Sequence, residues 1–248
     1  GGDMSKVTVI TGGTSGIGKG IAKKILENAG ESDRLYISYG HNQERAERFL
    51  ESLSPTDQEK VILIRADMSS YEEMMKFARR IKEEAGHVDW LINNVGISTY
   101  AKYEDYTFEE WSRIVNTNLS VPVFLVKELR PVMKEGGSIL FTGSYAGQQA
   151  YSSSLVYGVT KAAVHFLTKS LVKEFEPKKI RVNAIAPGFI ETSWHKNRTP
   201  ESYERINRKV ALHRFGTVEE VADMAYAVLS NGYMNGSIVD IHGGYDYF

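Results

Sequence analysis

The sequence predicts an α/β protein built on a doubly wound, mainly parallel sheet of about seven strands, with helices on both faces. Short β-branched, apolar runs alternate with amphipathic helical patterns along the whole 248-residue chain, which is typical of parallel strands joined by helices. The run at 6–11 is followed by a glycine-rich turn and then a helical pattern, the order of a phosphate-binding unit. No internal repeat or low-complexity linker interrupts the chain, so we expect residues 4–248 to form one domain.

Composition narrows the class of protein. The net charge is −1 and 25% of the residues are charged, so nothing favours a nucleic-acid or membrane partner. The chain has no cysteine, which excludes disulfides, thiolate nucleophiles and cysteine-ligated metals, and we expect no metal site. No apolar run approaches the roughly 20 residues of a membrane-spanning helix. We expect a cytoplasmic protein, and we interpret residues 1–3, ahead of Met4, as an expression remnant.

The apolar periodicity locates the individual elements. Strands are predicted at the short runs that are mostly apolar and β-branched, as in strands buried on both faces: 6–11, 34–39, 61–66, 88–92, 137–143, 180–185 and 237–241. Helices are predicted at the amphipathic segments 19–28, 44–54, 70–85, 108–129, 155–175 and 218–229. Ser70 is a candidate N-cap, and Pro122 is expected to kink or break its helix.

The glycine-rich turn, Gly12 to Gly18, predicts a dinucleotide site of the Rossmann type. Its glycines let the backbone approach a pyrophosphate, and the helix that follows supplies N–H donors and a positive dipole end. A tight turn without a ligand is the alternative interpretation. The end of the second strand bears on the choice of cofactor, because an acid there would take the ribose 2′-hydroxyl of NAD.

No acid occurs between Asp33 and Glu44. Tyr39, His41 and Asn42 occupy this region instead, and His41 and Asn42 carry groups that can donate to a phosphate. The absent acid favours NADP(H) and leaves NAD(H) open, and both polar residues have the alternative of being solvated loop residues.

A second group of polar residues follows the predicted strands. Asp67, Asn94, Ser144 and the Pro187-Gly188 pair all come at strand C-ends, where ligands of such sheets bind. Tyr157 and Lys161 are four residues apart on the helix after Ser144, so their side chains share one face. We expect the ammonium to favour the phenolate and to lower the pKa of Tyr157, which suits a general acid or base.

These residues resemble the motifs of the short-chain dehydrogenase/reductase family over essentially the full chain. Each motif is modest alone, but together they occur in order and at the family's spacing, with thirteen positions from Ser144 to Tyr157. The motifs are Thr11-Gly12-x-x-x-Gly16-x-Gly18, Asn93-Asn94-Val95-Gly96, Asn118, Ser144, Tyr157-x-x-x-Lys161 and 181–188 (RVNAIAPG).

The resemblance implies a catalytic set of Asn118, Ser144, Tyr157 and Lys161. Tyr157 would protonate a carbonyl oxygen during reduction or deprotonate an alcohol during oxidation. Lys161 would lower the Tyr157 pKa and bind the nicotinamide ribose, Ser144 would donate to the substrate oxygen, and Asn118 would hold a water that links Lys161 to solvent. A strand-end cap for Ser144 and a polar kink for Asn118 are the structural alternatives.

The resemblance also implies a cofactor set, in which Asp67 meets the adenine amino group, Asn94 shapes the adenosine site and Thr192 reaches the carboxamide or phosphates. Val95 departs from the alanine of the family and adds bulk near the cofactor, and Ser15 stands where members that prefer NADP often have a basic residue. The full set is Gly12, Thr14, Ser15, Gly16, Ile17, Gly18, Tyr39, His41, Asn42, Asp67, Met68, Asn94, Val95, Gly96, Tyr157, Lys161, Pro187, Gly188, Ile190 and Thr192.

The segment 193–214 is variable in this family and is expected to close over the substrate. It is rich in basic residues, which would attract an anionic substrate such as an acyl thioester on a phosphopantetheine arm or would simply form a solvated helix face. The chain looks most similar to the 3-oxoacyl-(acyl carrier protein) reductase branch. The residues expected to line the substrate pocket are Gln148, Gln149, Tyr151, Phe189 and Trp194.

The function implied is an NAD(P)-dependent oxidoreductase that acts on a small carbonyl compound, including a 3-oxoacyl thioester, or on the matching alcohol. A non-catalytic NADP(H) sensor is the main alternative, and a nucleotide-sugar epimerase or dehydratase is a third. The resemblance further implies a homodimer or homotetramer built through the helices that carry Asn118 and Tyr157. The C-terminal helix, the final strand and the tail from Tyr245 to Phe248 are expected to add contacts.

Overall fold

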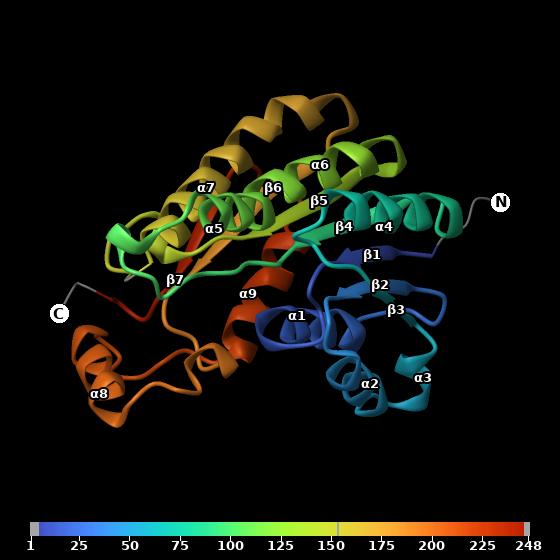
Figure 1. Cartoon of the computed structure of the whole chain (residues 1–248). Coiled ribbons are helices and arrows are strands. Elements are labelled where there is room, and N and C mark those ends of the chain that lie inside the picture. Colours follow the sequence, from blue (N-terminus) through green and yellow to red (C-terminus); the bar gives the residue numbers. More distant parts are fainter. Residues whose placement is uncertain (1–4, 153, 246–248) are drawn as a thin grey trace.

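The computed structural model describes residues 5–152 and 154–245, which form one sheet with helices packed on both of its faces (Figure 1). The strands are all parallel and lie in the order β3-β2-β1-β4-β5-β6-β7, which confirms the predicted doubly wound architecture. Their bounds are β1 Val7–Ile10, β2 Arg34–Tyr39, β3 Val61–Arg65, β4 Val88–Asn93, β5 Met133–Thr142, β6 Arg181–Pro187 and β7 Ile238–Ile241.

The helices follow the strands in alternation, as expected. Their bounds are α1 Gly16–Glu27, α2 Gln43–Glu51, α3 Pro55–Gln58, α4 Tyr71–Glu84, α5 Phe108–Val115, α6 Val121–Leu129, α7 Leu155–Phe175, α8 Pro200–Lys209 and α9 Val218–Ser230. Among the described residues, no helix combines the length and the apolar character needed to cross a membrane.

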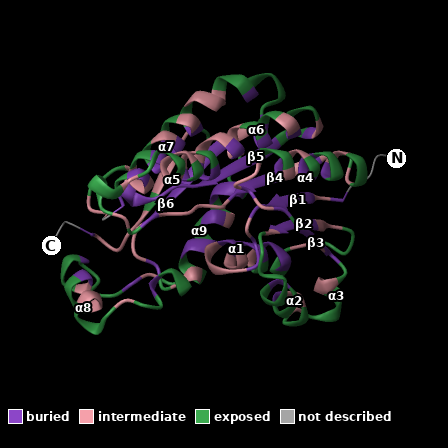
Figure 2. Ribbon diagram, in the orientation of Figure 1, coloured by how far each residue is buried: buried purple, intermediate pink, exposed green. Residues whose placement is uncertain are grey.

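Two hydrophobic layers hold the helices to the sheet. On one face, Ile10 and Ile92 pack with side chains of α1 and α9, such as Ile21 and Val221. On the other face, their chain neighbours Val9 and Leu91 pack with side chains of α4, α6 and α7. Because adjacent strand residues point to opposite faces, both neighbours are buried, which explains the uninterrupted apolar runs. Figure 2 shows the buried centre of the sheet and the exposed outer sides of the helices.

Several boundaries differ from the sequence-based expectation, and both α1 and β5 begin earlier than expected, at Gly16 and Met133. The helix expected at 108–129 is divided into α5 and α6 by a π-helical segment, Asn116–Ser120, just ahead of the expected break at Pro122. The helix expected at 44–54 ends at Glu51 and is followed by the short α3. The segment 193–214 contains a ten-residue helix, α8, which lies apart from the sheet in Figure 1.

The two ends of the chain are described only in part. The expected expression remnant at 1–3 lies outside the described residues, as do positions 246–248 of the aromatic tail. Tyr245 is described and is buried within its own chain, where its ring lies 4.8 Å from the ring of Tyr151.

Candidate active site

The C-terminal ends of the parallel strands meet along one edge of the sheet and open into a cavity of about 910 Å³. Residues from the turns after β1, β2, β3, β4, β5 and β6 line it. This is the edge where doubly wound sheets bind ligands. Of the predicted site residues, those lining the cavity are Gly12, Ser15, Gly16, Ile17, His41, Asp67, Met68, Asn94, Val95, Gly96, Ser144, Tyr157, Lys161, Pro187, Gly188, Ile190 and Thr192.

The glycine-rich turn brings backbone close to the cavity at the start of α1. Gly12 and Gly16 have φ angles of 66° and 54°, which side-chain-bearing residues rarely adopt. A Cβ at Gly18 would overlap the Gly12 carbonyl oxygen. Ser15, the N-cap of α1, makes no side-chain capping bond, so the first N–H groups of the helix are left for an anion such as a pyrophosphate. Thr14 and Gly18 do not line the cavity, because the turn packs them inward.

Asn94 joins three strand ends beside this turn. Its backbone N–H donates to Thr11 Oγ1 at 3.0 Å, its Nδ2 donates to the Gly12 carbonyl at 3.2 Å, and its Oδ1 accepts from Thr142 Oγ1 at 3.0 Å. These bonds fix the spacing of β1, β4 and β5 at the cavity. Asparagine can make the two side-chain bonds because its amide carries both a donor and an acceptor.

The adenosine end of the cavity contains Asp67, whose oxygens already have partners. Oδ1 accepts from the Ser69 N–H at 2.9 Å and from Ser69 Oγ at 2.6 Å, and Oδ2 lies 3.1 Å from His41 Nε2. Burial acts to raise the pKa of Asp67, but the bonds from Ser69 and His41 outweigh it and lower that pKa. Asp67 is therefore an anion at neutral pH.

The residues after β2 differ from the expectation. Tyr39 and Asn42 do not line the cavity; Asn42 caps α2 by accepting from the Arg45 N–H at 2.9 Å. Ser38, Gly40 and Arg45 do line it, and sequence reasoning missed them. Arg45 is exposed and, among the described residues, forms no ion pair. It lies in the first turn of α2, six residues beyond the end of β2.

Lys161 is buried beneath the active-site residues. Its Nζ donates to the Thr142 carbonyl at 2.8 Å, and a Cβ added to Gly96 would lie 3.1 Å from that Nζ. Burial without a carboxylate partner lowers the pKa of Lys161 to about 8. The ammonium is thus still the main form at neutral pH, but it is held at an energetic cost.

Tyr157 shares a hydrogen bond with Ser144 and lies with its ring 5.7 Å from that of Trp194. The expectation that Lys161 lowers the Tyr157 pKa is wrong for this arrangement, because burial raises that pKa and the bond with Ser144 offsets only part of the rise. The Lys161 Nζ is directed to Thr142 and lies 5.5 Å from the Tyr157 ring centroid. A phenol with a raised pKa keeps its proton at neutral pH, so the proton is present for donation.

Ser144 is positioned by a histidine that sequence reasoning missed. The Ser144 N–H donates to His165 Nε2 at 3.2 Å, and Ser144 Oγ accepts from the Ala146 N–H at 3.1 Å. A Cβ at Gly143 would overlap the His165 ring. Burial, together with the nearby Lys161, lowers the pKa of His165 to about 4, so its ring is neutral and Nε2 can accept.

Asn118 lies in the π-helical segment and does not line the cavity. Its Oδ1 accepts from the Ile97 N–H at 2.8 Å, and its Nδ2 donates to the Ile97 carbonyl at 2.9 Å and to Thr160 Oγ1 at 3.0 Å. Both amide hydrogens therefore have protein partners. The side chain ties the loop after β4 to α7, which carries Tyr157 and Lys161, and so acts as a positioning residue.

Aromatic side chains form the substrate end. Tyr100, Tyr151, Phe189, Trp194 and Tyr245 line it, which confirms the expectation for Tyr151, Phe189 and Trp194. Gln148 and Gln149 do not line this end of the cavity. The Gln148 side chain instead donates from Nε2 to Asp240 Oδ1 at 2.6 Å. Within the part of the chain that the structure describes, no three His, Asp or Glu side chains gather as metal ligands.

The arrangement fits a bound dinucleotide. The cavity runs from the free N-terminus of α1 past Asp67 to the Tyr157 hydroxyl, and its volume suits a ligand of that size. Gly12 and Gly16 leave room for the pyrophosphate, and Tyr157, Ser144 and Lys161 lie together at the other end. Reduction of a carbonyl group by a dinucleotide requires a site that binds the cofactor phosphates and a group that donates a proton, and this cavity contains both.

Comparisons with known proteins identify the family of the chain. Residues 12–246 match a family model described as enoyl-(acyl carrier protein) reductase. The chain is 32% identical over 245 residues to a 3-oxoacyl-[acyl-carrier-protein] reductase of Chlamydia muridarum, with 97% of each chain covered. It is 34% identical over 252 residues to an acetoacetyl-CoA reductase of Rhizobium meliloti, with 99% of this chain and 100% of the relative covered.

A solved structure shows the same fold. A short-chain dehydrogenase from Burkholderia cenocepacia, crystallised in complex with NADP, superposes with a TM-score of 0.88 at 25% identity, covering 96% of this chain and 97% of its own. The fold of the chain thus agrees with that of this relative. The chain belongs to the short-chain dehydrogenase/reductase family and is an NAD(P)-dependent oxidoreductase.

Proposed function

We propose that the protein reduces a small carbonyl compound with NADPH, and that Tyr157 supplies the proton. The observation that carries the proposal is the meeting of Ser144, Tyr157 and Lys161 in one cavity with the free N-terminus of α1. NADPH bound along this cavity would supply the hydride. The reverse reaction, oxidation of the matching alcohol, uses the same residues.

The roles of the residues follow from their protonation. The buried Tyr157 phenol keeps its proton and donates it to the carbonyl oxygen as negative charge develops there. The Ser144 hydroxyl donates to the same oxygen and stabilises that charge. Lys161, whose Nζ is held by the Thr142 carbonyl, is assigned the other expected role, binding the nicotinamide ribose of the cofactor.

We propose Arg45, with His41 and Ser15, as the residues that favour the 2′-phosphate of NADP(H). All three line the cavity near the end of β2, and the sole lining carboxylate there, Asp67, is occupied by Ser69 and His41. An arginine can bind a phosphate with two parallel donors. The NADP-bound Burkholderia relative is consistent with this preference, and NAD(H) binding at lower affinity is compatible with it.

The relatives from Chlamydia muridarum and Rhizobium meliloti are both named as reductases of β-keto thioesters, which supports a compound of this class as a candidate substrate. A panel of ketones, alcohols and an acetoacetyl thioester, assayed with NADPH and with NADH by absorbance of the reduced nicotinamide, tests the proposed function. We expect consumption of NADPH with at least one carbonyl compound. Binding of NADPH without turnover of any compound would instead support the non-catalytic sensor, which the shared cavity of Ser144, Tyr157 and Lys161 does not favour.

We also propose that a second copy of the chain packs on α5 and α7. Large apolar side chains are exposed along these helices, including Phe108, Val159 and Phe166, the first and last 84% and 73% exposed. Light scattering tests this, because a monomer at micromolar concentration would reject it. A cytoplasmic location stays a prediction from the sequence.

A further inference from the structure

The substrate end of the cavity is lined by cations and by no carboxylate. Among its lining residues the one carboxylate is Asp67, at the adenosine end. The substrate end is lined instead by cations from two sides: Arg113 of α5 on one, and Arg198, Arg205 and Lys209 of the 193–214 segment on the other. Cations on both walls, with no carboxylate between them, create a positive potential where the substrate must enter.

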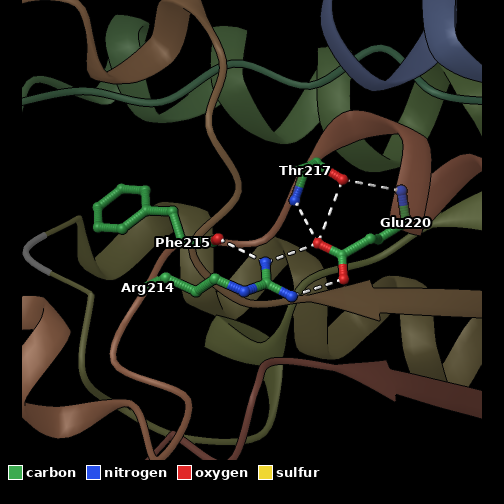
Figure 3. Close-up of polar contacts among 4 residues, drawn as sticks. All are labelled: Arg214, Phe215, Thr217 and Glu220. Atoms are coloured by element: carbon green, nitrogen blue, oxygen red, sulfur yellow. Dashed lines mark hydrogen bonds and ion pairs between the residues drawn. The ribbon is translucent and has the colours of Figure 1, made fainter.

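The basic residues of the 193–214 segment differ in whether they are neutralised. Arg208 pairs with Glu204 at 3.1 Å. Arg214 binds both oxygens of Glu220 at 2.7 Å, and the Thr217 N–H donates to the same carboxylate (Figure 3). The Arg214 guanidinium holds the pKa of Glu220 at about 2. The first ion pair lies within the segment and the second joins the segment to α9, so two of its cations are neutralised.

Arg198 and Arg205 are arranged differently. Arg198 Nη1 donates to Ser202 Oγ at 2.8 Å, and Arg205 Nη2 approaches the same oxygen at 3.4 Å. Two guanidinium groups thus converge on one neutral hydroxyl, although like charges repel. Neither they nor Lys209 forms an ion pair among the described residues. The pair brings charged N–H donors, the groups that bind carboxylate and phosphate oxygens most strongly, close together at the cavity.

Arg198 is also held in place. Its Nε and Nη2 lie 3.2 and 3.1 Å from His195 Nδ1, and its guanidinium lies 5.5 Å from the Phe189 ring centroid. His195 is buried, and its pKa is lowered to about 4 by burial and by Arg198, so the ring is neutral and accepts. Glu191 faces His195 but accepts from the Tyr203 hydroxyl at 2.9 Å and does not line the cavity.

We propose that the substrate of the reductase is an anionic carbonyl compound, whose carboxylate or phosphate group is bound by Arg198 and Arg205. Lys209 and Arg113 flank this anion site. Trp194, whose ring lies 5.7 Å from that of Tyr157, and Phe189 form an apolar surface between the two guanidiniums and the proton donor. The substrate class is therefore a carbonyl group, an apolar spacer and a terminal anion. The inference rests on the proposed carbonyl reduction.

Binding measured without turnover separates this inference from the proposed function. Calorimetric titration of 5-oxohexanoate and its methyl ester into the protein saturated with NADP⁺ compares an anion with a neutral analogue. Acetoacetyl-CoA and the acetoacetyl thioester of N-acetylcysteamine form a second pair, which distinguishes a phosphate-bearing substrate from a carboxylate. We expect the charged member of at least one pair to bind about tenfold more tightly.

Variants assign the effect to the two arginines. In the double variant Arg198→Gln/Arg205→Gln the preference for the charged compound should fall to about one, while the neutral compound binds as before. Arg208→Gln, on α8 like Arg205 but paired with Glu204 and not lining the active-site cavity, is the matched control and should retain the preference. Raising NaCl from about 0.05 M to about 0.5 M should weaken only the charged compound in the unaltered protein.

Two results would overturn the inference: equal affinity for both members of each pair in the unaltered protein, or a preference that survives in the double variant. The salt titration provides the answer if the double variant does not fold, since an affinity that salt leaves unchanged also counts against the site. A carbonyl panel run in parallel reports on the proposed reduction alone.

Discussion

Replacing Lys161 with methionine isolates the cost of burying an ammonium at the centre of the site. Lys161 is 3% exposed and its Nζ has the Thr142 carbonyl as a partner, but no carboxylate among the described residues pairs with it. Burial lowers its pKa from the ordinary 10.5 to about 8. Each pKa unit corresponds to about 1.4 kcal/mol, so the whole shift corresponds to about 3 kcal/mol.

The sign of the pH dependence follows from which state holds the proton. Between pH 8 and 10.5 the unfolded chain keeps a proton on Lys161 that the folded protein has released. The free energy of unfolding therefore rises with pH in this window, and this contribution is lost again as the pH falls toward 8. Methionine has no proton to exchange, so the variant lacks this slope.

The measurement is urea denaturation of both proteins without cofactor at several pH values. We expect the free energy of unfolding of the unaltered protein, relative to Lys161→Met, to increase by about 2 to 3 kcal/mol between pH 7 and pH 10. Lys169→Met, an exposed position on the same helix, is the control and should track the unaltered protein. A difference between the unaltered protein and Lys161→Met that changes by less than about 1 kcal/mol would refute the reasoning.

Three further outcomes follow from the site. Arg45→Ala should weaken NADPH binding by about tenfold and leave NADH binding unchanged, since only NADPH presents a 2′-phosphate; fluorescence titration measures both, and an equal loss would contradict the assignment. His165→Leu should lower kcat by about tenfold with little change in NADPH affinity, because the buried Ser144 N–H loses its acceptor; an unchanged kcat would remove His165 from the positioning residues. Gly18→Ala should abolish NADPH binding, because its Cβ would overlap the Gly12 carbonyl; retained affinity by the same titration would show that the turn adjusts.

The framework of the protein was predictable because it depends on local patterns. The buried strands are runs of apolar residues, Ser70 caps α4 by accepting from the Glu73 N–H, and α7 spans the range that its apolar pattern predicts. Asp67, Asn94 and Ser144 were found because strand C-ends of a parallel sheet share one edge.

The remaining features depend on contacts between distant residues. The π-helical segment forms where Asn118 binds the Ile97 backbone, 21 positions away in the chain. Arg45 reaches the cavity from within α2, where its side chain has no strand-end signature. The rise in the Tyr157 pKa reflects burial, and the Lys161 amine is directed to Thr142; neither feature is visible in a spacing of four residues.

The central claim is that the Tyr157 hydroxyl gives its proton to a carbonyl compound beside bound NADPH. Single-turnover stopped-flow kinetics of Tyr157→Phe, with a substrate found in the carbonyl panel, test it most directly when combined with NADPH titration of the same protein. The account predicts unchanged NADPH affinity and a rate of NADPH oxidation lower by a factor of about 100 or more, the usual contribution of a general acid. Oxidation at a rate near that of the unaltered protein would contradict it.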